Sequence, residues 1–403
     1  MENRKHILMV MPVMHGGGAE RVASLLLNEF QRLGHKCECL LTNDVPEMVV
    51  ENDLSPDVSL LFLQNFQKAI GGLAGLRYTL MRWYSTLFCR LFELLSLSVP
   101  AHFAYCSFVS QYYSQIQALH DYLKARPNAT VFTFLQPSIP MLMLAARGLP
   151  NRVVFSERGG SAKLIMSKRY GFKFISKYYA RADAVVFQTP DAQAAYPSNI
   201  SVKGKLISNP IKPNLPLPYK GERRKVINTF CRISREKNLP LLLEAFLQVH
   251  KKHLDYQLHV IGDALNPDGE AILIKLKQYV TSHCLEQIVS FLPFSANVHQ
   301  EILADAMFIN CSDYEGMSNS MLEAMAIGLP TICTDCPIGG AHQTITDHEN
   351  GLLVSVGNAQ ALANAMCEII ENPELAQRLS ANGTRIRDKL NVKTIAGYWL
   401  DLL

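Results

Sequence analysis

Two glutamates, Glu315 and Glu323, are the residues whose type and spacing most clearly suggest chemistry in this chain. They lie eight positions apart, so that one sits in a polar turn and the other one turn into the helix expected to follow. A carboxylate repels a phosphate but is a strong hydrogen-bond acceptor for neutral hydroxyl groups, such as those of a ribose or a hexose. The pair is therefore a candidate binding site for a sugar nucleotide; the alternative is that Glu323 is merely a solvated helix residue.

The elements around the two glutamates are expected to favour an anion. Residues 306–311 form an apolar run suited to a buried strand, and Ser318 or Asn319 can cap a helix that ends at 328–330. At such a helix start the amides of residues 316–319 have no partner within the helix, and the dipole favours an anion such as a pyrophosphate. Open parallel sheets bind ligands in the loops that follow the carboxyl ends of their strands.

The segment from Glu315 to Glu323, continued to Pro330, resembles the E-x7-E signature of the retaining glycosyltransferases of family 4, which have the GT-B fold. The resemblance implies that Glu315 lies by the transferred sugar and that Glu323 binds the ribose. It also implies that the sugar and the diphosphate are held by the amides of four consecutive residues, Gly316, Met317, Ser318 and Asn319.

Residues 230–239 resemble the strand and loop in which that family places an arginine and a lysine on the donor pyrophosphate, here Arg232 and Lys237. Two cations beside one diphosphate stabilise the bound donor and the charge that grows on it as the glycosidic bond breaks. Cys231 stands where the family usually has glycine. The alternative is a pair of solvated basic residues before a helix.

Two further segments are similar to donor-binding parts of the family. Residues 16–18 are glycines between an apolar strand and an apolar-periodic helix, and they resemble the loop that closes over the diphosphate, so Gly17 and Gly18 are predicted donor contacts. Leu292, followed by Pro293 where glycine is commoner, resembles the segment that packs on the nucleotide base. A tight turn and an ordinary strand end are the respective alternatives.

Length and composition predict two domains. At 403 residues, 48% hydrophobic and 18% charged, the chain is too long for one typical core and ordinary for a globular α/β protein. We predict an N-terminal Rossmann-like acceptor domain (1–210), a proline-rich linker (211–225), a C-terminal Rossmann-like donor domain (226–390) and a last helix (391–403). The resemblance implies that the parallel sheets face each other across a cleft and that the last helix packs back on the first domain.

Residues 66–122 are rich in aromatic and aliphatic side chains, and Lys68, Arg77, Arg82 and Arg90 are spaced through them. No uninterrupted apolar run reaches the roughly 20 residues that a spanning helix needs. A basic, aromatic amphipathic helix can lie in a membrane interface, which would suit a lipid-linked acceptor. The alternative is a set of helices packed on the sheet of the first domain.

Residues 155–160 form a polar, glycine-containing break after an expected strand, so they should face the cleft. Many members of the family have a histidine in this region that touches the transferred sugar. This chain has Glu157 and Arg158 instead, and we predict that they contact the sugar or the acceptor.

Other classes of function find no support in the sequence. The chain has no Asp-x-Asp and no His/Cys cluster with ligand spacing, so we expect neither a metal nor a separate cofactor. Its ten cysteines are spread over the whole chain, which favours reduced thiols in the cytoplasm, and the polar N-terminus is not that of a signal peptide. The basic residues are not clustered as in nucleic-acid-binding proteins.

The sequence thus predicts a retaining, metal-independent hexosyltransferase, with Glu315, Arg232 and Lys237 as catalytic residues. It would move a hexose or N-acetylhexosamine from a nucleotide-diphosphate sugar, a UDP-sugar by preference, to a hydroxyl of a glycan acceptor, lipid-linked by preference, in cell-surface polysaccharide or lipopolysaccharide synthesis. The expected location is the cytoplasm, with peripheral attachment to the inner face of the cytoplasmic membrane as an option. The alternatives are a GT-B sugar-nucleotide epimerase and a non-catalytic sugar-nucleotide-binding or membrane-associated scaffold.

Overall fold

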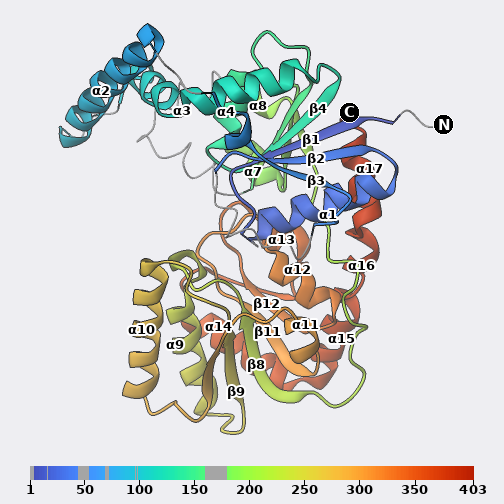
Figure 1. Cartoon of the computed structure of the whole chain (residues 1–403). Helices are drawn as coiled ribbons and strands as arrows, with labels where there is room; N and C mark the ends of the chain where they lie inside the picture. The colour runs from blue at the N-terminus through green and yellow to red at the C-terminus, as the bar shows by residue number, and fades with distance from the viewer. Residues whose placement is uncertain are drawn as a thin grey trace. The chain divides into compact units, whose positions relative to one another are not determined.

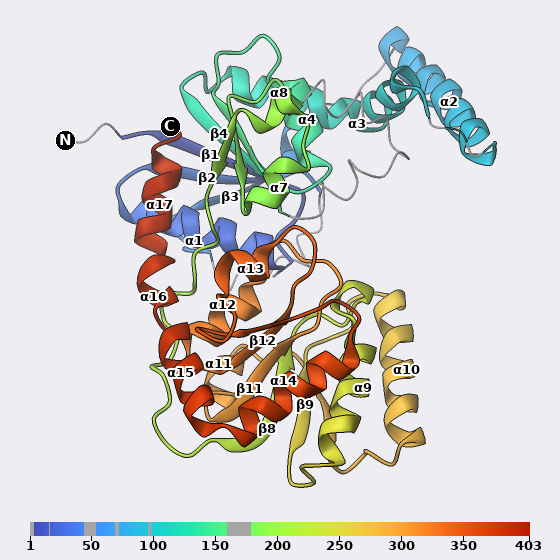
Figure 2. The same cartoon turned by 180° about the vertical axis from the view of Figure 1, so that it is seen from behind.

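The computed structural model describes residues 4–15, 17–43, 54–68, 72–95, 97, 99–158 and 179–403. The chain divides into two compact units: unit 1 comprises Met1–Pro210 and Val392–Leu403, and unit 2 comprises Ile211–Asn391. Each unit is built on one parallel sheet with helices around it (Figures 1 and 2). The predicted α/β class with two Rossmann-like parallel-sheet domains is confirmed.

Unit 1 has a seven-stranded sheet in the order β3-β2-β1-β4-β5-β6-β7. Its inner strands are short apolar runs that are almost wholly buried, as parallel strands covered on both faces must be. The strands are β1 (His6–Met11), β2 (Lys36–Leu41), β3 (Ser59–Phe62), β4 (Ala129–Phe134), β5 (Val153–Ser156), β6 (Ala184–Phe187) and β7 (Gly204–Leu206). The helices are α1 (Gly18–Arg32), η3 (Leu63–Phe66), α2 (Gly72–Leu94), α3 (Ala101–Lys124), α4 (Ser138–Ala145), α7 (Pro190–Ala194), α8 (Ser198–Ser201) and α17 (Val392–Leu400).

The C-terminal helix α17 belongs to unit 1 and packs beside α1 (Figures 1 and 2). Its Trp399 is 1% exposed and lies edge-on to Phe132, with ring centroids 5.2 Å apart, and 5.5 Å from the ring of Phe134. Both phenylalanines come from β4, so the last helix contributes its largest side chain to the core of the first sheet.

Unit 2 has a six-stranded sheet in the order β10-β9-β8-β11-β12-β13. The strands are β8 (Arg224–Phe230), β9 (Gln257–Ile261), β10 (Val289–Leu292), β11 (Asp305–Asn310), β12 (Thr331–Thr334) and β13 (Leu352–Val354). The helices are η4 (Arg235–Lys237), α9 (Leu239–His250), α10 (Pro267–Ser282), α11 (Val298–Glu301), α12 (Asn319–Ala326), α13 (Gly340–Thr344), α14 (Ala359–Glu371), α15 (Pro373–Gly383) and α16 (Ile386–Lys389).

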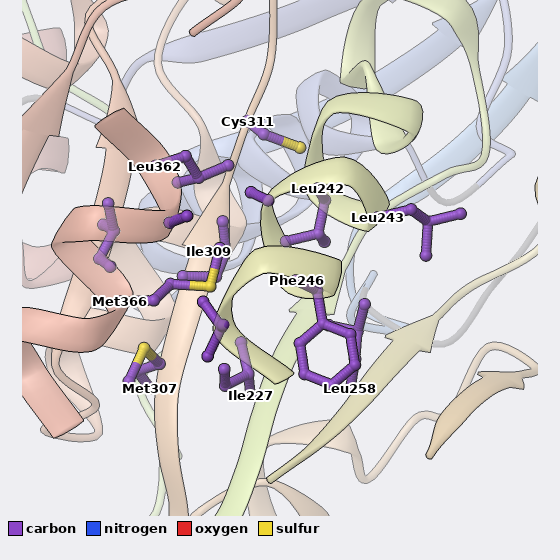
Figure 3. Packing of buried hydrophobic residues seen from close by; sticks show 14 of the residues in the cluster. Ile227, Leu242, Leu243, Phe246, Leu258, Met307, Ile309, Cys311, Leu362 and Met366 are labelled. Atoms are coloured by element: carbon purple, nitrogen blue, oxygen red, sulfur yellow. The ribbon is translucent and has the colours of Figure 1, made fainter. Parts of the chain in front are cut away.

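Strand β11 shows how unit 2 buries both faces of its sheet. Met307 and Ile309 join the cluster formed with α9 and α14, whereas Phe308 joins the opposite cluster with α12. Successive side chains of a strand point to opposite faces, so one strand supplies both cores. Figure 3 shows the first cluster, with Leu242 of α9 on one side of Ile309 and Met366 of α14 on the other.

The stretch 211–225, predicted as a linker, belongs to unit 2. The amide of Ile211 donates to the carbonyl of Leu390 at 2.9 Å, and Nη2 of Arg387 donates to the carbonyl of Leu215 at 3.0 Å. Both Ile211 and Leu215 are buried. The start of this stretch therefore lies against the segment around α16, and β8 starts at Arg224.

Helices α2 and α3 form an antiparallel hairpin in unit 1 (Figures 1 and 2). The C-terminal part of α3 packs on α4 and buries Leu119 and Leu123, while its N-terminal part pairs with α2. The hydroxyl of Tyr122 also donates to Oε2 of Glu38 on β2 at 2.8 Å. The alternative that this region packs on the sheet therefore holds for the end of α3, whereas α2 pairs with α3. None of the helices formed by the described residues is long and apolar enough to cross a membrane.

Candidate active site

Lys237 and Glu315 meet at the carboxyl edge of the second sheet, where the lysine Nζ donates to the carboxylate Oε2. Lys237 ends the short helix η4 after β8, and Glu315 lies in the loop after β11. Because β8 and β11 are neighbours in the sheet, loops far apart in sequence reach the same point. A hydrogen bond of 2.9 Å from the amide of Asp313 to the carbonyl of Glu236 ties these loops together.

The Lys237–Glu315 pair holds the positive charge of the lysine in a partly buried position. The side chains of Lys237 and Glu315 are 16% and 23% exposed. Burial alone would lower the pKa of Lys237, but the charge of Glu315 and its hydrogen bond outweigh this effect, so the pKa is raised above its ordinary value. Glu315 also accepts a hydrogen bond of 3.3 Å from the hydroxyl of Ser312. Lys237 is therefore charged at neutral pH and oriented toward a carboxylate that a ligand can share.

The N-terminus of α12 follows directly on Glu315. Ser318 is the N-cap, and its hydroxyl accepts from the amide of Met321 at 3.3 Å. The positive end of the helix dipole thus lies next to Lys237 and Glu315, where it favours an anion. Gly340 was not singled out from the sequence, yet a Cβ there would lie 1.8 Å from the carbonyl oxygen of Gly316. Only a glycine lets α13 begin so close to this loop.

Glu323 lies one turn into α12 and is buried, so the alternative of a solvated helix position is wrong. Its Oε2 is 2.8 Å from Nε2 of His299 on α11, and the ring of Phe230 stands edge-on to that histidine at 5.6 Å. Sequence reasoning missed His299, because nothing in its spacing links it to a residue 24 positions further on.

Arg232 lies in the loop after β8 but does not join the lysine–glutamate pair. Its Nη2 donates to Oε1 of Glu236 at 3.0 Å, and the side chain is 53% exposed. An exposed ion pair of this kind is worth little, so the guanidinium can exchange Glu236 for a stronger anion. Leu292 ends β10, two strands from β8, and is 37% exposed. Phe294, two residues further along the chain, is 63% exposed and was not singled out from the sequence.

In unit 1, the predicted glycine loop lies at the start of α1. Gly17 is the extended N-cap of α1, which starts at Gly18, and a Cβ on Gly17 would meet Oε2 of Glu20 at 2.4 Å. Gly16 lies outside the described residues. Gly17 and Gly18 thus lie at a helix start, as an anion-binding loop requires. Their contact with a donor stays a prediction.

Glu157 and Arg158 follow β5. Glu157 is fully buried rather than facing solvent, and it accepts a hydrogen bond from the hydroxyl of Tyr196. Arg158 donates from Nη1 to Oδ1 of Asn209 at 2.5 Å, lies 4.0 Å from the ring centroid of Phe134, and has its pKa lowered to about 9 by burial. Their contact with sugar or acceptor stays a prediction, weaker for Glu157 because its carboxylate already has an internal partner.

Among the residues that the structure describes, one group combines three metal-ligand types: His253, Cys367 and Glu371, whose ligand atoms lie within 4.8 Å of one another. It sits where α9 and α14 end, and it contains none of the predicted site residues. A hydrogen bond of 3.0 Å between the histidine and the glutamate accounts for that arrangement.

Several known proteins are similar to this chain in sequence. Residues 218–386 match the family described as Glycosyl transferases group 1. The N-acetylgalactosamine-N,N'-diacetylbacillosaminyl-diphospho-undecaprenol 4-alpha-N-acetylgalactosaminyltransferase of Campylobacter jejuni is 27% identical over 262 residues, which are 61% of this chain and 68% of that protein. The poly(ribitol-phosphate) alpha-N-acetylglucosaminyltransferase of Staphylococcus aureus is 29% identical over 199 residues, which are 49% of this chain and 38% of that protein.

The crystal structure of Anabaena HepE in complex with UDP resembles the whole chain, with a TM-score of 0.73 and 18% identity over 98% of both chains. This likeness covers both parallel-sheet units. The predicted GT-B fold is confirmed.

Proposed function

We propose that this chain is a retaining, UDP-sugar-dependent glycosyltransferase, since residues 218–386 match the family described as Glycosyl transferases group 1. The observation that carries the proposal is the Lys237–Glu315 pair beside the N-terminus of α12, with the buried Glu323 one turn further along that helix. A lysine, a helix N-terminus and two carboxylates suit a ligand that has a diphosphate flanked by two sugars. A UDP-sugar is such a ligand, and HepE, which has the same fold, is described in complex with UDP.

Each group has a distinct task in this proposal. Lys237 and the first amides of α12, from Gly316 to Asn319, hold the diphosphate, and Arg232 joins them when it leaves Glu236. Glu323, held by His299, accepts the ribose hydroxyls, while Glu315 accepts a hydroxyl of the transferred sugar. Leu292 lies where the base would pack. The same cations stabilise the negative charge that develops on the leaving UDP.

In the transfer, the acceptor oxygen forms a bond to the anomeric carbon while the bond from that carbon to UDP breaks. The electron pair of the broken bond stays with the terminal phosphate of UDP, which takes the acceptor's proton. Both relatives are named for alpha-linked N-acetylhexosamine transfer, the configuration that retention gives from an alpha-linked UDP-sugar. We therefore propose retention and a hexose or N-acetylhexosamine as the transferred group.

The proposed acceptor is a hydroxyl of a glycan, lipid-linked as the name of the C. jejuni relative indicates for that enzyme, in cell-surface polysaccharide synthesis. We propose that neither a metal nor a cofactor is required, because Lys237, Arg232 and the α12 N-terminus supply the positive charge a metal would bring. The proposed location is the cytoplasmic side of the membrane. The epimerase alternative is not favoured, because the named relatives are transferases.

The test is a panel of UDP-sugars incubated with the purified chain, with slow hydrolysis followed as UDP release. We expect one UDP-hexose or UDP-N-acetylhexosamine to be hydrolysed faster than the others, without added metal and in the presence of a chelator. The configuration of the free sugar at early times should be alpha, read by NMR. If no UDP-sugar is bound or hydrolysed, the UDP assignment fails; if the first product is the beta anomer, retention fails.

A further inference from the structure

Helix α2 carries an apolar stripe on its outer face. The stripe consists of seven exposed residues that return to one side of the helix: Leu76, Leu80, Trp83, Tyr84, Leu87, Leu91 and Leu94. On a helix of 3.6 residues per turn these positions fall within an arc of roughly 100°. Trp83 is 75% exposed and Leu94 is 82% exposed, values far from those of core side chains.

The opposite face of α2 is the one that packs on α3. Tyr78 stacks on Tyr113 with ring centroids 3.5 Å apart, and Phe88 stacks on Phe103 at 4.9 Å. Ser85, on the same side, is fully buried. The hairpin is thus already held together by an aromatic seam. Of the stripe, Tyr84 also reaches this seam, with its ring centroid 5.6 Å from that of Phe103.

Positively charged side chains flank the stripe on both edges. Arg77 falls on one edge and Arg90 on the other, and both are exposed, as is Arg82 further round the helix. From residue 72 to residue 92 the helix has these three arginines and no aspartate or glutamate; Glu93 comes at its end. Arginine can bury its stem along apolar surface while its guanidinium reaches a phosphate, and Trp and Tyr favour the boundary between hydrocarbon and water.

We propose that the α2 stripe lies in the interfacial layer of a bilayer that contains anionic phospholipid, with the helix axis along the membrane plane. The arginines contact lipid phosphates and the leucines and Trp83 enter the acyl boundary. Because the helix axis would lie along the membrane plane, the attachment proposed here is peripheral. This inference does not depend on the donor chemistry, although it would bring the enzyme to a lipid-linked acceptor.

A second copy of the chain suits the stripe less well than lipid does. A two-fold interface through this face would bring the arginines at the stripe edges of one copy toward those of the other. The helix has no carboxylate before Glu93 to neutralise them, so like charges would meet, which opposes association. An anionic lipid surface satisfies the apolar stripe and the charges together.

The experiment uses the full chain and its two tryptophans. Trp399 is buried in unit 1, so an environment-dependent change of intrinsic fluorescence reports on Trp83. We expect a blue shift with mixed phosphatidylcholine–phosphatidylglycerol vesicles, quenching by lipids brominated near the headgroup, and a weaker response with phosphatidylcholine alone. Trp83→Phe should bind by flotation without the fluorescence response.

Paired variants test the stripe and its charges separately. The double variant Leu80→Ser with Leu87→Ser should lose roughly tenfold or more in vesicle partitioning. The matched double variant Leu254→Ser with Leu265→Ser, at exposed positions of unit 2, should bind as the unchanged chain. Arg77→Gln with Arg90→Gln should remove the preference for anionic over neutral vesicles.

Hydrolysis of UDP-sugar without vesicles should be the same in the unchanged chain and in the α2 variants, which separates this inference from the proposed function. The inference is overturned if the unchanged chain does not bind anionic vesicles, or if the double serine variant binds them equally well. It is likewise overturned if the chain is a dimer that the serine variant converts to a monomer with no vesicle binding in either state.

Discussion

Nε2 of His299 lies 2.8 Å from Oε2 of Glu323, and both side chains are buried in unit 2. The carboxylate proposed to bind the donor ribose is thus held by a side chain from another helix. A buried carboxylate free to rotate would lose orientational order before it met its ligand, so His299 acts as a positioning residue.

His299→Ala should therefore weaken UDP binding by roughly tenfold, about the worth of one hydrogen bond to a charged group, with little change in kcat. His299→Gln can still donate a hydrogen bond and should recover part of the affinity. Calorimetric titration measures the UDP affinity of each variant, and steady-state kinetics with the UDP-sugar measure its KM and kcat. An equal loss of kcat in both variants with no change in UDP affinity would contradict a positioning role.

Variants of Glu315 and Glu323 should differ in whether they weaken the binding of UDP or only that of the UDP-sugar. Glu315→Gln should leave UDP binding unchanged or stronger, because a negative charge beside the diphosphate site is removed. The extra affinity that the UDP-sugar has over UDP should be lost, because the sugar hydroxyl loses its carboxylate acceptor. Glu323→Gln should weaken UDP and UDP-sugar alike, because the ribose is common to both. Titrating each variant with both ligands decides the matter. The assignments are reversed if Glu315→Gln weakens UDP itself and Glu323→Gln spares it.

The account of this site rests on sequence signals of very different strength. Ser318 as a helix cap, the turn at Glu315 and the helix end near Gly328 follow from local residue types, and the structure has each of them. The partners of the charged groups follow from no local rule. Lys237 and Arg232 look alike in the sequence, yet the sheet brings one to Glu315 and leaves the other with Glu236.

The same limit applies in unit 1. The sequence places Glu157 in a polar break after a strand, but its side chain turns inward because Tyr196 supplies a buried donor. Residues 66–122 show an amphipathic, aromatic pattern that fits both a packed and an exposed helix. Only the aromatic seam between α2 and α3 decides which face of α2 is covered.

Stability of unit 1 should depend on pH through Glu38, the third residue of β2. Burial alone would raise its pKa, but hydrogen bonds from Lys36, Tyr122 and His6 outweigh burial and lower the pKa from 4.5 to about 2. Because the folded pKa lies below the unfolded one, the stabilisation is complete above pH 4.5 and is lost as the pH falls toward 2.

Glu38→Gln should destabilise unit 1 at neutral pH by on the order of 2 kcal/mol and flatten the decline of stability below pH 4.5. Urea unfolding at several pH values measures both effects. The exposed Glu374→Gln serves as the control and should behave as the unchanged chain. The same acid slope in Glu38→Gln as in the unchanged chain would refute the assignment.

The C-terminal helix should be needed for the stability of unit 1. Trp399→Ala removes a buried ring from between Phe132 and Phe134 and should cost about 3–5 kcal/mol. Tyr398→Ala, on the same helix but 53% exposed, should cost less than about 1 kcal/mol. Calorimetric melting measures the two variants side by side. Equal melting temperatures for both would mean that α17 does not stabilise unit 1.

The central claim is that Lys237 carries the charge that holds the donor diphosphate and stabilises its departure. The most direct measurement is the rate of UDP release from the preferred UDP-sugar by Lys237→Ala, with the exposed Lys251→Ala as the control. We predict that kcat/KM falls by about 100- to 1,000-fold in Lys237→Ala and is unchanged in Lys251→Ala, with both variants folded by circular dichroism. A Lys237→Ala variant that is folded and releases UDP within about twofold of the unchanged rate would contradict the account. So small a change in rate would mean that Lys237 contributes almost nothing to stabilising the transition state.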